Sequence, residues 1–197
     1  MTDVANTAYV LRPGEGRSID LGAFQMNASA ALASCNPGGP NQDGIWFAGA
    51  TPRTTAQTPR NIRANVEEYS PFISVGPVTS AWVMLSSGGS KWAQDGWWKD
   101  PNGARSAFVQ WTDATGHFFT EHFTASALGT FPTYQTIYNP AAGGAQSEFV
   151  FERNGSVLWR VSPTLWVPAT VQSEGEIHNR TDQMPGGFNN PVYLDQM

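Results

Sequence analysis

The 197-residue sequence is poor in cysteine and in lysine. Its one cysteine, Cys35, excludes an internal disulfide bond and leaves the redox compartment open. Lysine occurs only at Lys91 and Lys99, and the arginines are scattered along the chain. Binding to a phosphate backbone requires a basic stripe, whereas this chain has a net charge of −5. We therefore expect no nucleic-acid partner.

Long hydrophobic runs are also missing. No apolar segment approaches the roughly 20 residues that a membrane-spanning helix requires. The first residues, MTDVANTAYVLRPGEG, show neither the basic region nor the apolar region of a signal peptide. We expect no insertion into a membrane, and the sequence leaves the location open, an extracellular or virion-surface position included.

Common nucleotide-binding and catalytic patterns are absent as well. The sequence contains no GxGxxG, no Walker A motif and no GxSxG. Its three histidines are His117, His122 and His178, and the first two are five apart, which places them on opposite faces of a strand. Nothing in the sequence brings histidines together as metal ligands, so we expect no metal and no cofactor.

Turn residues and aromatic residues are plentiful. Twenty glycines and fourteen prolines are spread along the chain, which also holds eight tryptophans and eleven phenylalanines. From residue 72 to about 177, short segments of alternating polarity are separated by turn signals, and Asn154-Gly155 marks the clearest hairpin. This pattern predicts one all-β domain over 1–197, an antiparallel β-sandwich of jelly-roll or concanavalin-like type.

Three segments depart from this pattern. Residues of about 34–58 and about 179–197 are rich in turns and predict a loop arm and a C-terminal tail. The two short strands expected around Pro13-Gly14 keep to the β pattern. A helix is predicted within 59–70, with Thr58 as its cap, Pro59 at its first position, and an apolar stripe at helical spacing formed by Ile62, Val66 and Tyr69. Glu67 and Glu68 are expected to be solvated.

The segment VLRPGEGRSIDLGAF, residues 10–24, resembles the opening strands of cupin domains. Cupins bind metal through clustered histidines that follow soon after such strands. The first histidine of this sequence is His117, so the resemblance implies a β architecture without the metal chemistry of that family.

A second resemblance covers about residues 81–176. Trp82-Val83-Met84-Leu85, a glycine turn, WAQDG and FVQW are similar to the glutamic peptidases, or eqolisins. That resemblance implies a concanavalin-like sandwich with a catalytic pair of glutamine and glutamate. The matching positions are Gln94 in WAQDG and either Glu174 or Glu176 in QSEGEI.

The alternation of strands groups these residues by face. Trp92, Gln94, Gly96 and Trp98 share one face of their strand, and Gln172, Glu174 and Glu176 share one face of theirs. If the two strands are neighbours, a polar pair walled by indoles follows. In a hydrolase the glutamate acts as general base and the glutamine amide donates a hydrogen bond to the oxyanion.

The same residues also suit binding without catalysis. Outward-facing tryptophans can form a platform for sugar rings, with Trp92, Trp98, Gln94 and Glu176 as binding residues and a neutral glycan as the ligand. Our first interpretation is a non-enzymatic β-sandwich that acts through its surface. It would be a structural or assembly component, such as a virion decoration protein or homomeric shell, or a glycan-binding module. Its arms favour contacts with other chains, as in a homo-oligomer. The alternative is a glutamic-peptidase-like hydrolase.

Overall fold

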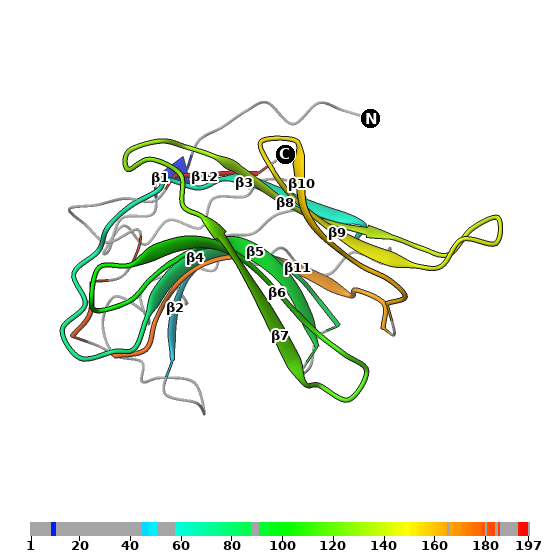
Figure 1. The fold of residues 1–197 in the computed structure, drawn as a ribbon, viewed down its shortest axis with the longest axis horizontal. Coiled ribbons are helices and arrows are strands. Elements are labelled where there is room, and N and C mark those ends of the chain that lie inside the picture. Colours follow the sequence, from blue (N-terminus) through cyan, green and yellow to red (C-terminus); the bar gives the residue numbers. More distant parts are fainter. Residues whose placement is uncertain are drawn as a thin grey trace.

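The computed structural model describes residues 9–10, 45–50, 58–87, 91–164, 166–179, 181–183, 185 and 193–196, and all that follows concerns these residues. Their twelve strands form two six-stranded antiparallel sheets that lie one above the other (Figure 1). These ranges hold no helix that could cross a membrane. The antiparallel β-sandwich predicted from the sequence is confirmed.

Each sheet combines strands from distant parts of the chain. The first sheet has the order β1 (Tyr9–Val10), β12 (Tyr193–Gln196), β3 (Asn61–Asn65), β8 (Thr133–Asn139), β9 (Glu148–Arg153) and β10 (Ser156–Val161). The second has the order β2 (Trp46–Ala50), β11 (Thr170–Ile177), β4 (Thr79–Ser86), β5 (Trp92–Lys99), β6 (Arg105–Thr112) and β7 (Phe118–Thr124).

Aromatic side chains fill the space between the sheets. Trp97 from the second sheet and Phe149 and Phe151 from the first are almost completely buried. The indole nitrogen of Trp97 donates to the backbone oxygen of Glu67 at 2.8 Å, so its polar atom is satisfied. Each such side chain contributes roughly 1.5–3 kcal/mol through burial. Trp98, next in sequence, points to the other face of the sheet, as alternation requires.

Two acidic residues lie in this core. Glu68, expected to be solvated, is only 1% exposed, so that expectation is wrong. Its carboxylate accepts from the hydroxyl of Tyr134 at 2.6 Å and pairs with Arg105 at 3.2 Å, and burial raises its pKa. Asp95 accepts from the hydroxyl of Thr136 at 2.6 Å. Complete burial raises the pKa of Asp95 to about 8.

The predicted helix within 59–70 is wrong, because residues Asn61–Asn65 form strand β3. Alternate residues from Ile62 to Glu68 are buried, which is the period of a strand. Ile62 and Val66 are four residues apart, a spacing that fits both a helix and a strand. Pairing of β3 with β8 and β12 decides between the two.

The expected arm and tail also contain strands. Within the arm of 34–58, strand β2 pairs with β11, and within the tail of 179–197, strand β12 pairs with β1 and β3. Both segments thus extend the sheets. Apart from Tyr9–Val10, the two strands expected around Pro13-Gly14 and the cupin-like segment lie outside the described residues, as do 34–44 and 51–57.

The hairpin at Asn154-Gly155 is confirmed. It joins β9 to β10, and its two residues have φ angles of 54° and 74°. Positive φ at both central positions is the type I′ turn for which Asn-Gly is the preferred sequence. The strand-like segments expected from residue 72 onward begin later, because the first strand after residue 72 is β4, which begins at Thr79.

Candidate functional site

The second sheet has one face that turns away from the first sheet, and we call it the open face. The register places side chains of β11, β4 and β5 in rows across it: Glu176 lies opposite Ser80, and Ser80 opposite Trp98. In the next row, Glu174 lies opposite Trp82, and Trp82 opposite Gly96. A side chain at Gly96 would overlap the backbone of Ala81, so only glycine fits there.

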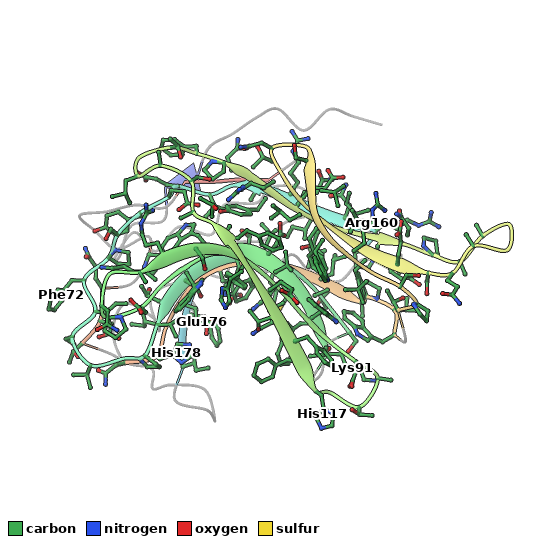
Figure 2. All side chains as sticks on the ribbon, viewed as in Figure 1. Phe72, Lys91, His117, Arg160, Glu176 and His178 are labelled. Carbon is green, nitrogen blue, oxygen red and sulfur yellow. The ribbon has the colours of Figure 1, made fainter. Side chains whose placement is uncertain are left out.

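A pocket of about 290 Å³ opens on this face. Strands β4 to β7 and β11, with the residues just before β4 and just after β11, supply its lining: Val78, Ser80, Gln94, Trp98, Phe108, Gln110, Thr120, His122, Glu176 and His178. Aromatic rings therefore alternate with amides, hydroxyls, imidazoles and one carboxylate, and no lysine or arginine is among these residues. Figure 2 shows Glu176 and His178 close together below the second sheet.

Glu176 is held in place by two neighbours. The indole nitrogen of Trp82 donates to Oε2 at 2.8 Å, and Nε2 of His178 lies 2.7 Å from Oε1. Only 15% of the side chain of Glu176 is exposed. The carboxylate thus has a fixed orientation at the pocket.

Gln94 belongs to a chain of side-chain hydrogen bonds. Its amide nitrogen donates to Oε1 of Gln110 at 2.8 Å, and the indole nitrogen of Trp92 donates to the same oxygen at 3.0 Å. The amide nitrogen of Gln110 donates in turn to Oγ1 of Thr120 at 3.0 Å. Three strands are thereby linked along the pocket floor.

Trp98 forms an aromatic wall beside His122. Its indole nitrogen donates to Oγ of Ser106 and, at 2.8 Å, to Nδ1 of His122. The centres of the Trp98 and His122 rings are 5.1 Å apart. Because an indole nitrogen can only donate, Nδ1 of His122 is the acceptor in this hydrogen bond.

The structure brings together some of the residues predicted from the sequence. Gln94, Trp98 and Glu176 line the pocket. Trp92 lies on the open face and contacts Gln110, whereas Glu174 lies on that face outside the pocket lining. The polar pair of Gln94 and Glu176 was conditional on neighbouring strands. Their strands are not neighbours, because β4 runs between β5 and β11.

Sequence reasoning missed the two histidines of the pocket. His178 follows Glu176 at the spacing of two that places both on one side of a strand, a signal that was available. His122 reaches the pocket only because β7 pairs with β6, which the sequence does not reveal. Within the described ranges, no three histidine, cysteine, aspartate or glutamate residues gather as metal ligands.

No family model and no curated protein matches the sequence. Among solved structures, Scytalido-glutamic peptidase with a peptide-based transition-state analogue matches at 13% identity and a TM-score of 0.46. That match covers 66% of this chain and 63% of the peptidase, so this chain spans less than two thirds of that structure.

Two glucanases show a similar likeness. Bacillus licheniformis β-glucanase matches at 10% identity and a TM-score of 0.47, covering 75% of this chain and 68% of the enzyme. The endo-1,3-β-glucanase of Streptomyces sioyaensis matches at 13% identity and a TM-score of 0.47, covering 76% of this chain and 67% of the enzyme. The resemblance to glutamic peptidases noted in the sequence is thus found again among solved structures, and at these values it carries no argument about activity.

Proposed function

We propose that the open face binds a carbohydrate that carries no negative charge, and that the pocket holds one of its sugar rings. The observation that carries this proposal is the lining itself. Trp98 offers an apolar ring face, the buried Phe108 lies in the same lining, and amide, hydroxyl and carboxylate groups lie beside them. A sugar ring has apolar C–H faces that stack on aromatic rings and hydroxyls that bond to such polar groups.

The size of the site agrees with one ring rather than a large ligand. A volume of about 290 Å³ lies just below the range of small-molecule pockets, which measure roughly 300–1,000 Å³. The aromatic surface continues beyond the pocket, where Trp92 stacks on Phe118 with ring centres 6.3 Å apart. Phe118 is 61% exposed, so a second ring of an oligosaccharide has a surface on which to lie.

A panel of neutral oligosaccharides tests the proposal by calorimetry. Trp98→Ala should weaken binding about tenfold or more, because it removes an aromatic wall of the pocket. Trp159→Ala is the matched control, since Trp159 is 38% exposed on β10 of the other sheet. Equal loss of affinity in both variants, or no binding by the wild-type protein, would contradict the proposal.

The hydrolase alternative is favoured by one observation, the presence of Gln94 and Glu176 in the same pocket. The register speaks against it. Gln94 lies opposite Met84 and Glu176 opposite Ser80, so the two positions differ by two strands sideways and four residues lengthwise. At the ordinary spacing of a sheet this puts their Cα atoms about 16 Å apart. A ligand can contact both side chains, whereas a single activated water cannot.

The assembly role predicted from the sequence depends on the state of the chain in solution. We propose that the protein associates with other copies, and its mass by light scattering tests this. A mass well above 21.3 kDa would support a homo-oligomer, and a mass of 21.3 kDa would contradict it.

A further inference from the structure

The tryptophans around the pocket each direct their N–H group at a neighbouring side chain. Trp82 donates to Glu176, and Trp98 donates to His122 and Ser106. Trp92 donates to Gln110. Trp98 is the one of these three that lines the pocket, so a ligand there meets its ring while its donor is already engaged.

The N–H group of Trp92 fixes the orientation of two amides. An indole nitrogen only donates, so the Gln110 atom 3.0 Å from it must be the carbonyl oxygen. The Gln94 atom 2.8 Å from that same oxygen must then be the amide nitrogen. Gln94 thus bonds to Gln110 through its amide nitrogen and not through its carbonyl oxygen. Since Gln94 lines the pocket, this oxygen is an acceptor for the ligand.

Glu176 adds acceptors and charge. A carboxylate has about four lone-pair positions, and the hydrogen bonds to Trp82 and His178 occupy two of them. Glu176 is the one acidic residue among those that line the pocket. No lysine or arginine lines the pocket to compensate for it.

Aromatic faces beside a carboxylate favour a cation. The electron-rich face of Trp98 attracts positive charge, and the net charge of the chain is −5. An ammonium group offers three donors and no acceptor, which matches the carboxylate of Glu176, while the carbonyl oxygen of Gln94 accepts from a hydroxyl at the other end of the ligand. A carboxylate group on the ligand would be repelled by Glu176.

We propose that the pocket selects an amino sugar, a ring bearing a positively charged amine, over the same ring with hydroxyl, acetamido or carboxylate groups. This inference rests on the proposed carbohydrate binding and names the sugar class. Trp92, outside the pocket lining, acts as a positioning residue because it fixes the Gln94 amide through Gln110.

Methyl glycosides that differ in one substituent provide the test. The probes have the gluco or the galacto configuration and carry hydroxyl, amino at C2, amino at C6, acetamido at C2, or a C6 carboxylate. Their affinities for the ¹⁵N-labelled protein are measured at pH 7 by NMR titration. We expect an amino glycoside to bind about tenfold more tightly than its hydroxyl counterpart, and the uronide to bind most weakly.

Two variants separate charge from orientation. Glu176→Gln keeps the shape and removes the charge, so the amino and hydroxyl glycosides should bind equally. Trp92→Phe releases the Gln110 and Gln94 amides. It should lower the affinity for the amino and the hydroxyl glycoside about two- to tenfold without changing the ratio of the two affinities. Glu148→Gln is the control, because Glu148 forms an exposed ion pair with Arg160 on the first sheet. It should change neither the affinities nor their ratio.

The outcomes distinguish this inference from the proposal beneath it. Equal affinity of amino and hydroxyl glycosides, or preferred binding of the uronide, overturns the inference and leaves carbohydrate binding in place. An amino preference that persists in Glu176→Gln also overturns it. Binding of none of the glycosides, together with none of the neutral oligosaccharides, overturns both.

Discussion

Gln94 and Glu176 line one pocket although their strands never pair. Strand β4 runs between β5 and β11, and it joins the two residues through Met84 and Ser80, four positions apart. The line from Gln94 to Glu176 therefore runs obliquely across three of the strands that line the pocket. Such a site suits contact with two ends of one ligand better than chemistry at one atom.

The first prediction follows from this separation. Wild-type protein should not cleave an unfolded protein substrate at any pH from 3 to 7, because Gln94 and Glu176 cannot share an activated water. Glu176→Gln and Gln94→Ala should be equally inactive. Cleavage by the wild type that either substitution abolishes, and that Glu174→Gln leaves intact, would contradict the binding account.

The buried carboxyl of Asp95 should make stability depend on pH. Its folded-state pKa is raised from 3.8 to about 8 by burial, so the folded protein keeps a proton that the unfolded chain releases. The contribution of Asp95 to stability is then fully present below about pH 3.8 and falls, by an amount on the order of a few kcal/mol, as the pH rises to about 8.

Asp95→Asn removes this dependence. In the wild type, the hydroxyl of Thr136 and the backbone N–H of Gln135 donate to Asp95. The asparagine amide has no proton to release and can still bond to both groups. Urea unfolding should show the variant more stable than the wild type at pH 8 and nearly equal at pH 4. Parallel pH profiles of the two proteins would show that Asp95 is charged in the folded state.

Gly96 should tolerate no side chain. An added Cβ would overlap the carbonyl oxygen of Ala81 and lie 2.7 Å from Cα of Trp82, within the sheet that carries the pocket. We expect Gly96→Ala to cost about 3 kcal/mol or more of unfolding free energy. Gly155→Ala is the comparison, because it meets no atoms but has a φ of 74°, and it should cost about 1 kcal/mol. Similar costs for both would contradict the clash.

Asp182 should stabilise the segment before β4. Its carboxylate accepts from the backbone N–H groups of Ser74 and Gly76 at 2.7 and 3.0 Å, and it is buried. Asp182→Ala should cost about 1–3 kcal/mol and speed hydrogen exchange at those two amides. Asp100→Ala, which removes an exposed turn contact to Ala104, should cost less. Unchanged exchange at Ser74 and Gly76 would disprove the tether.

Part of this site was predictable from the sequence. Alternation correctly placed Trp92, Gln94 and Trp98 on one face, because a strand of period two leaves no other arrangement. Strand order was not predictable, since pairing between distant segments depends on tertiary packing. Hence β4 between β5 and β11, and His122 in the pocket, appear only in the structure.

Local spacing misled the sequence argument at β3. Ile62 and Val66 fit a helical stripe, yet the sheet offers backbone partners on both sides and buries Ala64 between them. The same effect explains β2 and β12. Short segments among turn residues carry little pattern of their own, and they become strands because neighbouring strands pair with them: β11 with β2, and β1 and β3 with β12.

The most direct test of carbohydrate binding is a map of the ligand contacts. An oligosaccharide that binds in the calorimetric panel is titrated into the ¹⁵N-labelled protein. Two-dimensional NMR follows the indole signals of Trp98 and Trp159 and the side-chain amide signal of Gln94. The account predicts that the signals of Trp98 and Gln94 shift together with one dissociation constant, while that of Trp159 stays in place. Shifts centred on Trp159, or none at Trp98 and Gln94, would contradict it.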